Sequence, residues 1–467
     1  MTASRPALLL VVAALGCSEP HVAEPDASAP TRDASAPDAD AAVAPVAYGE
    51  RCGNGIDDDG DGLIDEDCPP SLFAGVFAPD VAADPAAAEI EAATGRPLSV
   101  LQTYRSTKPG DVDLIAPDLA AIFARGSVAH LNVEPAGYTA QQYATPHADP
   151  LATDLPAMGA EVASALAAQP TGRVILTFGA EMNGNWTDWG CLPAGQYIAL
   201  FRAAHDAVTA ALAAAKLDPR RVRWAYGPNS TSSSSCGSAA GYYPGHAYVD
   251  LLGMSAYRSG TASVDEAVVA PMSALFDALA YPVAWRRDRF VLLQTGSREV
   301  TGDDRDAWIR TLFTTLTHDE RAAGLIYFDA ADWAVASGGP GWAGLTTAIA
   351  DAPVADRQLD GIFRPHFWDV AYGDAAFPEI EALVDAGVTS GCDTGPARFC
   401  PDDPIRAVDA TTMLARAGMP SATLTDPVTE AALAVALGAA PAAPSIATRA
   451  RAAVLIAHAA RLAPMPL

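Results

Sequence analysis

The chain has 467 residues, 50% of them hydrophobic, which is enough for two or three domains with one large core. It carries 29 Lys and Arg against 56 Asp and Glu, so its formal net charge is −27. A surface this acidic argues against a nucleic-acid partner, because nucleic-acid binding requires cationic patches. The same balance suits a secreted or surface protein and is compatible with calcium binding.

Residues 1–17 have the pattern of a secretion signal: one Arg, a short apolar run, and a small residue before Cys17. The apolar run is too short to cross a bilayer as a helix. Its ending, AALGC, resembles a bacterial lipoprotein signal, which implies lipid modification of Cys17. We therefore predict a secreted lipoprotein of the outer membrane or cell surface, attached to the membrane by its lipid anchor only. Ordinary cleavage of the signal is the alternative.

Two short segments follow the signal. Residues 18–50 are rich in Ala, Pro, Asp and Ser, a composition that predicts a disordered tether. Residues 51–69 contain the run CGNGIDDDGDGLIDEDC, whose alternating Asp residues match the first half of a calcium loop. The motif resembles the Cys-flanked, Asp-rich calcium motifs of surface proteins, although Cys68 replaces the usual Glu at position 12. Dense carboxylates repel one another without a cation, so Ca²⁺ is favoured over a merely solvated acidic linker; the expected ligands are Asp57, Asp59, Asp61 and Asp65.

Residues 71–352 alternate short apolar runs with Ala-rich amphipathic segments. Eight β/α units of this kind predict an α/β fold, a (β/α)8 TIM barrel whose active site lies at the C-terminal ends of the strands. Glu181 stands at the end of the fourth expected strand. The expected strands cover 73–79, 98–105, 127–135, 173–181, 222–229, 249–257, 290–296 and 324–329, and helices are expected at 111–125, 194–215, 262–279 and 303–317, among others.

Residues 360–467 have a different pattern, with apolar side chains at helical spacing followed by a Gly-rich stop, a Cys-closed loop and a second helix. Residues 423–462 have the look of a decayed second copy. The segment resembles a Cys-containing S-layer homology repeat, which implies a small all-α domain attached to a cell-wall or envelope polymer. A small helical domain with another partner is an equally weighted interpretation.

The seven cysteines leave six after Cys17 is assigned to lipid, and these six form three local pairs. In an oxidising compartment such pairs predict disulfides. The pairing, inferred from proximity in the sequence, is Cys52 with Cys68, Cys191 with Cys236, and Cys392 with Cys400.

The run FGAEMNGNWTDWG (178–190) resembles the acid/base segment of glycoside hydrolase family 26, typified by β-mannanases. Three further runs resemble later strands of that barrel in the right order: VRWAYGPN (222–229), YVDLLGMSAYR (248–258) and GLIYFDAADW (324–333). The resemblance implies a β-linked polysaccharide, mannan first, with Glu181 as acid/base and Tyr257 beside the nucleophile. It also implies substrate contacts from Asn183, Trp186, Trp189, Trp224, Asn229 and Trp333.

Two positions depart from the family pattern. A retaining glycosidase needs a second carboxylate to attack the anomeric carbon, and in this family that Glu ends strand seven. Here strand seven reads FVLLQTGS, so Gln294 stands at the nucleophile position, and an amide can neither form the glycosyl ester nor supply a full charge. The family's His before the acid is Ala180.

Three interpretations therefore stay open: a polysaccharide-binding pseudoenzyme, an active glycosidase that uses another carboxylate, and a purely structural Glu181. For the second, the candidates are Glu134, Glu299 and Asp329, and an inverting route would need a base about 6.5–9.5 Å from the acid. The His residues show no HxxxH or HExxH spacing, so a catalytic zinc is not expected and the barrel needs no cofactor.

Overall fold

The structure is a computed structural model of the whole chain. It describes residues 72–77, 85–279, 290–298, 304–319, 321–351, 359–363, 365–370, 374–394, 397–420, 422–440 and 444–462. The signal, the tether and the Asp-rich motif lie outside these residues. Among the helices described, none combines the length and the apolar composition needed to cross a membrane.

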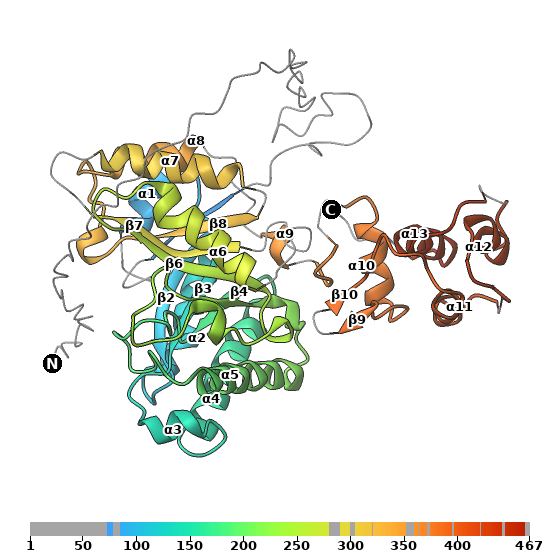
Figure 1. Cartoon of the computed structure of the whole chain (residues 1–467), viewed down its shortest axis with the longest axis horizontal. Coiled ribbons are helices and arrows are strands. Elements are labelled where there is room, and N and C mark those ends of the chain that lie inside the picture. Colours follow the sequence, from blue (N-terminus) through green and yellow to red (C-terminus); the bar gives the residue numbers. More distant parts are fainter. Residues whose placement is uncertain are drawn as a thin grey trace, which may run out of the picture.

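Eight parallel strands close into a barrel in sequence order, with β8 pairing back onto β1 (Figure 1). This confirms the fold class expected from the alternating pattern. The strands are β1 Phe73–Phe77, β2 Val100–Ser106, β3 Val128–Glu134, β4 Val174–Phe178, β5 Val222–Tyr226, β6 Leu251–Arg258, β7 Phe290–Ser297 and β8 Ala322–Phe328.

Helices surround the barrel and cover its outer face. They are α1 Ala86–Thr94, α2 Ile115–Ala124, α3 Ala140–Ala144, α4 Leu151–Ala168, α5 Ala194–Ala214, α6 Ala270–Ala278, α7 Arg305–Thr317 and α8 Trp342–Asp351. Each of the four helices expected from the sequence is present. Two of them open with a short non-α turn, a 3₁₀ turn at 112–114 and a π turn at 265–269.

The barrel interior is apolar at its N-terminal end. Along each strand every second side chain points inward, and the inward residues here form one buried cluster. Three further side chains of this cluster, Leu359, Ile362 and Phe363, come from the segment after the barrel, around α9 Asp360–Phe363, and cover this end. The strand residues of the cluster include Phe73, Val100, Val128, Ile175, Leu251 and Val291. The N-terminal end of the barrel is therefore filled, and only the opposite end is available for a site.

Arg223, on β5, fixes the α9 segment to the barrel. Its side chain is 6% exposed and donates hydrogen bonds to the carbonyl oxygens of Ile362 (3.0 Å), Phe363 (3.1 Å) and Pro365 (2.5 Å). It also pairs with Asp250 at 3.3 Å. A charged group this deeply buried is tolerated because its donors are satisfied by carbonyl acceptors and a carboxylate.

A second, smaller domain follows the barrel and has its own apolar core (Figure 1). Its helices are α10 Phe377–Asp385, α11 Ala407–Arg416, α12 Glu430–Ala436 and α13 Arg449–Ala459. The sequence predicted an all-α domain; the structure adds one short antiparallel hairpin, β9 Asp393–Thr394 with β10 Ala397–Arg398. Whether this domain is an S-layer homology module stays a prediction.

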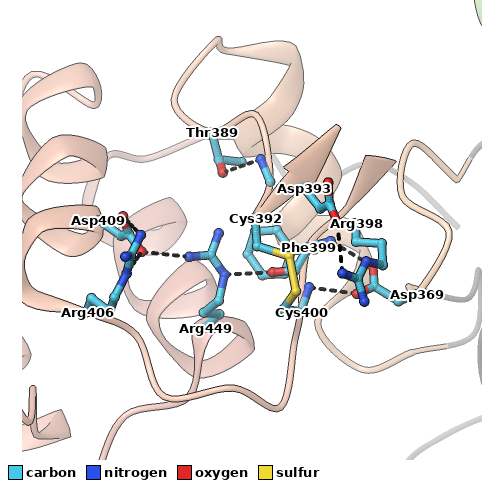
Figure 2. The surroundings of a disulfide bond; sticks show 11 residues. Asp369, Thr389, Cys392, Asp393, Arg398, Phe399, Cys400, Arg406, Asp409 and Arg449 are labelled. Carbon is cyan, nitrogen blue, oxygen red and sulfur yellow. Dashed lines mark hydrogen bonds and ion pairs between the residues drawn. A yellow bond between two sulfur atoms is a disulfide. The ribbon is translucent and has the colours of Figure 1, made fainter. Parts of the chain in front are cut away.

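A disulfide between Cys392 and Cys400 closes that hairpin (Figure 2). The Asp369 carboxylate accepts the backbone N–H groups of Phe399 and Cys400, both at 2.7 Å. From the other side, Arg449 of α13 donates to the Phe399 carbonyl at 2.6 Å and pairs with Asp409 of α11 at 3.2 Å. The hairpin is thus tied to the two helices behind it by side-chain contacts as well as by the covalent link.

The two domains meet through charged side chains. Arg220, just before β5, pairs with Glu381 of α10 at 3.1 Å and with Asp385 at 3.4 Å. Glu381 is fully buried and also accepts the backbone N–H of His366 at 2.7 Å. Burial raises the pKa of Glu381 to about 7 against the opposing effect of Arg220 and that N–H.

Replacing Arg223 with Met should lower the free energy of unfolding by about 2–4 kcal/mol, because three buried carbonyls lose their donor. Urea unfolding followed by fluorescence measures this change. Arg310→Met is the matched control, since Arg310 is exposed on α7. Equal destabilisation in both variants would contradict the role assigned to Arg223.

Candidate active site

The C-terminal half of the barrel interior is polar where the N-terminal half is apolar. Gln102 of β2, His130 and Asn132 of β3, and Thr177 of β4 are all at most 1% exposed and follow the inward alternation. His130 Nε2 and the Thr177 hydroxyl lie 2.9 Å apart. Burial lowers the pKa of His130 to about 3, so this ring is neutral and supplies no positive charge to the groups above it.

Glu181 lies three residues beyond the end of β4, in the loop that opens the C-terminal end of the barrel. Its backbone has φ 58°, a left-handed conformation that is costly for any residue except Gly. Hydrogen bonds from its N–H to Gly227 O (2.8 Å) and from Gly184 N–H to its carbonyl (2.9 Å) hold this conformation. The loop after β4 thus fixes the direction in which the Glu181 side chain leaves the backbone.

The Glu181 carboxyl is held by neighbouring donors. The Trp186 indole N–H donates to its Oε2 at 2.6 Å. Burial raises the pKa of Glu181, and hydrogen bonding from Trp186, Ser255 and Asn229 opposes that rise. The net shift favours the protonated form relative to a free Glu, which is the form that a general acid must have.

Gln294 reaches the site through an irregularity in β7. The pairing of β6 with β7 shifts between Met254 and Ser255, so that Ser255 pairs with Gln294 and Leu293 has no partner in the register. Leu293 belongs to the apolar interior, where an added Cβ on Gly253 would lie 2.5 Å from it. A bulge of this kind changes the direction of the side chains that follow it. Here it lets Gln294 face the polar end of the barrel although the preceding residue, Leu293, also faces the interior.

Tyr257 and Gln294 are hydrogen-bonded, as the sequence resemblance implied for the nucleophile position. The Tyr257 hydroxyl donates to Gln294 Oε1 at 2.7 Å. An amide carbonyl accepts this bond as a carboxylate would, so the contact needs no charge at residue 294. Trp333 packs on Tyr257 with ring centroids 4.6 Å apart, and Arg298 lies 4.6 Å above the Trp333 ring.

Tyr104, on β2, links the two halves of this site, although no motif in the sequence singles it out. Its hydroxyl accepts a hydrogen bond from Gln102 Nε2 at 3.3 Å and is also hydrogen-bonded by Asn132 and Gln294. Burial raises the pKa of Tyr104 well above its usual value, and the charges of Glu181 and Glu134 raise it further. The hydroxyl therefore keeps its proton. The one sequence signal for Tyr104 is its position two residues after Gln102 on the same strand, which places both side chains on the same face of the sheet.

Glu134 ends β3 and lies beside Glu181 at the same opening. Burial raises the pKa of Glu134 to about 7, and the charges of Asp111, Glu181 and Asp188 raise it as well. Asp111 accepts the Ser106 N–H at 2.5 Å, and Asp188 accepts the Gly137 N–H at 2.7 Å. These two carboxylates therefore hold loops in place, whereas the Glu134 carboxylate has no hydrogen-bond partner among the described residues.

Three of the residues predicted to contact substrate are buried in packing in this structure. Trp189 is 4% exposed, and its indole N–H donates to Ala180 O at 2.8 Å. Trp224 is 3% exposed and packs on Phe201 of α5, outside the barrel. Asn183 is fully buried, and its amide joins the loops after β4 and β5 through Asn229.

The remaining predicted contacts are placed at the opening. Trp186 is 52% exposed, which leaves a ring face for a ligand, and Trp333 is partly exposed beside Tyr257. Asn229 is partly exposed, accepts the Thr231 N–H at 2.9 Å and lies near the Glu181 carboxyl. A disulfide joins Cys191 to Cys236 and so connects the loops after β4 and β5.

Several predicted residues lie outside the described part of the chain. These are Glu299 of the alternative carboxylates, and Cys17, Cys52, Cys68, Asp57, Asp59, Asp61 and Asp65. The other alternative, Asp329, accepts the Val335 N–H at 2.6 Å and so fixes the loop after β8.

One group of possible metal ligands comes together among the described residues: Asp369, Cys392 and Cys400, in the smaller domain (Figure 2). The two sulfur atoms are joined to each other, and the carboxylate accepts two backbone N–H groups. Thiolates are the form in which Cys binds metals, so this arrangement is a structural hairpin and offers no metal site.

The middle of the barrel is similar to a known protein family. Residues 152–282 match the model of glycosyl hydrolase family 26. The match is less than a third of the chain, and it includes Glu181, Asn229 and Tyr257 but neither Glu134 nor Gln294. No curated protein matches the chain.

Among solved structures, a Cellulomonas fimi endo-β-1,4-mannanase double mutant is similar at 16% identity, covering 64% of this chain and 78% of that one, with a TM-score of 0.46. A family 26 protein from Muricauda sp. is similar at 12% identity, covering 62% and 92%, with a TM-score of 0.44. The family 26 domain of an endo-β-mannanase/endo-β-glucanase from Prevotella bryantii is similar at 13% identity, covering 62% and 92%, with a TM-score of 0.44.

Replacing Glu134 with Gln should stabilise the protein at pH 8 by about 1–3 kcal/mol and leave it unchanged at pH 4. The folded-state pKa, about 7, lies above the unfolded value of 4.5, so stability falls as pH rises between these values and the ionised carboxylate opposes folding above them. Urea unfolding at both pH values measures the difference. The control is Glu89→Gln, at an exposed position on α1, where no gain is expected. A Glu134→Gln variant less stable at pH 8 would contradict the assignment.

Proposed function

We propose that the C-terminal opening of the barrel binds a β-linked polysaccharide, β-mannan first, and that Glu181 donates a proton to the glycosidic oxygen. The observation that carries this proposal is the placement of a strained, partly buried Glu181 opposite the Tyr257–Gln294 pair at the one open end of a closed barrel. Polar groups converging at the C-terminal ends of the strands are where barrel enzymes bind their substrates. The match of residues 152–282 to glycosyl hydrolase family 26 supports the same reaction class.

The electrostatics of Glu181 suit a proton donor. Burial raises the pKa of its carboxyl, as hydrolysis of a glycosidic bond requires of the acid. The Trp186 indole fixes the Oε2 atom of this carboxyl at 2.6 Å. The same Trp186 ring is 52% exposed, so one side chain orients the acid and offers a stacking surface for a sugar.

A second candidate function is binding without cleavage, and Gln294 is the observation that favours it. The amide at the nucleophile position is 5% exposed and hydrogen-bonded to Tyr257 at 2.7 Å, so it fits its surroundings without a charge. In this pseudoenzyme, Glu181 and Gln294 would hold sugar hydroxyls, and Trp186 and Trp333 would stack on sugar rings.

We further propose that the barrel works at the outer membrane or cell surface as a lipoprotein. The support is the signal pattern ending at Cys17, followed by the tether at 18–50. Calcium at the Asp-rich motif and attachment of the C-terminal domain to an envelope polymer are proposed on their sequence patterns alone.

Replacing Glu181 with Gln should lower kcat/KM on the best β-glycan by about 10²–10⁴-fold, because the leaving oxygen loses its proton donor. Reducing ends released from mannan, glucomannan and mixed-linkage glucan give the rate, and calorimetry with the same glycans gives the affinity. Affinity should change little, since Gln keeps the shape and an acceptor for Trp186.

The exposed Glu89→Gln variant on α1 is the matched control and should behave as the unmodified protein. Binding of a glycan with no release of reducing ends would favour the pseudoenzyme. Activity that survives in Glu181→Gln would contradict the role of Glu181, and absence of both binding and release on every glycan would contradict the proposed substrate class.

A further inference from the structure

The barrel and the smaller domain are joined at two neighbouring residues. Phe367 is buried in the core of the smaller domain, whereas Trp368 is buried with the barrel core, where its ring centroid lies 5.5 Å from that of His246. The smaller domain stands to one side of the barrel, with α10 nearer to it than α11, α12 and α13 (Figure 1). Because each core holds one side of this crossing point, the contacts of α10 set how the two domains are oriented.

α10 reaches the barrel through two carboxylates. The Arg220 guanidinium, in the 3₁₀ turn Pro219–Arg221 before β5, lies 3.1 Å from Glu381 and 3.4 Å from Asp385. The Glu381 side chain is 0% exposed, whereas that of Asp385 is 53% exposed. We call this contact between α10 and Arg220 the junction. Glu381 is therefore the acidic group that the junction encloses.

Arg220 carries one positive charge and is surrounded by three carboxylates. Besides the two on α10, Asp218 accepts from Arg220 Nε at 3.1 and 3.2 Å and pairs with a terminal nitrogen at 3.0 Å. Burial alone would raise the pKa of Asp218, but the hydrogen bonds and the charge of Arg220 outweigh it and lower that pKa. One guanidinium cannot neutralise three carboxylates, so an ionised Glu381 places a surplus negative charge in an enclosed position.

No further cation is paired with Glu381 among the described elements around it. Arg223 is engaged by Asp250 and by three carbonyl groups. The backbone N–H of His366 donates to Glu381 Oε1 at 2.7 Å, but burial and the charges of Arg220 and Arg223 lower the pKa of the His366 ring, which is neutral near pH 7. Behind α10, the basic side chains of α13 pair with other carboxylates: Arg449 with Asp409, Arg451 with Glu430, and His458 with Glu379.

We propose that the junction is a pH-dependent clamp: Glu381 keeps α10 against the barrel while its carboxyl is protonated, and the contact loosens once that carboxyl is ionised. Loosening lets water reach the carboxylate, which relieves the surplus charge. The crossing point at Phe367 and Trp368 keeps the domains joined, so the smaller domain changes its orientation without leaving the barrel. No residue of the barrel opening takes part, so this inference is independent of the proposed function.

The direction of the pH dependence follows from the two states of Glu381. With α10 against the barrel, burial raises the pKa of Glu381 to about 7, although the His366 N–H and Arg220 oppose the rise. Once water reaches the carboxyl, its pKa returns toward the ordinary value of 4.5. The closed junction therefore binds the proton more tightly, and raising the pH through this window favours the open one. The ratio of closed to open junction should fall by about 10²-fold between pH 5 and pH 8.

Pulsed electron paramagnetic resonance on the full chain tests this clamp. Spin labels are attached at Glu89 of α1 and Val408 of α11, both exposed, through an unnatural keto amino acid that leaves the cysteines untouched. One distance is expected at pH 5, and a second, broader population at pH 8. Glu381→Gln, neutral at every pH, should give the pH 5 distance at both values. Glu381→Met is a second neutral variant and should respond in the same way.

Glu379→Gln is the matched control, because Glu379 lies on the same helix and pairs with His458 inside the smaller domain. It should keep the pH response of the unmodified chain. An identical distance distribution at pH 5 and pH 8 in the unmodified chain would overturn the clamp, as would an opening on acidification. A pH response that persists in both neutral Glu381 variants would assign the effect to general repulsion between acidic surfaces and overturn the role of Glu381.

Discussion

Closure of eight parallel strands in sequence order is the constraint on which the rest of the structure depends. Once the sheet closes, all strands end at the same opening. The inward side chains near that end, every second residue of each strand, then point toward one another. The filled N-terminal end, with Phe363 and its neighbours as a plug and Arg223 holding them, leaves one place for polar groups to converge. Residues as far apart in sequence as Tyr104 and Gln294 meet there for this reason.

A neutral side chain, Gln294, lies at that opening. Its amide oxygen accepts the hydrogen bond of the Tyr257 hydroxyl at 2.7 Å, so this contact needs no charge. Arg298 lies over the Trp333 ring, and the His130 ring below the site is neutral because burial lowers its pKa to about 3. Burial raises the pKa of Glu134 to about 7, and the neighbouring charges of Asp111, Glu181 and Asp188 raise it further.

The sequence predicted the positions of some residues and not of others. Apolar runs of five to eight residues separated by amphipathic segments were enough to give the strand order and the barrel, because burial imposes those patterns locally. The position of Glu181 at the opening and the contact of Tyr257 with Gln294 also followed from the linear pattern. The burial of Trp189, Trp224 and Asn183 did not follow from the sequence. An aromatic or amide side chain with the same sequence neighbours can either pack in the core or line a cleft.

By itself, the sequence determined which side chains are available to the site, among them a Glu after the fourth strand and a Gln in the seventh. The tertiary structure decided which side chains share the opening. The bulge at Leu293 turns Gln294 toward Tyr257, and closure of the barrel brings Tyr104 of β2 to Gln294 of β7. Neither is written in a local pattern, because both depend on how neighbouring strands align, and alignment is fixed only when the whole sheet closes.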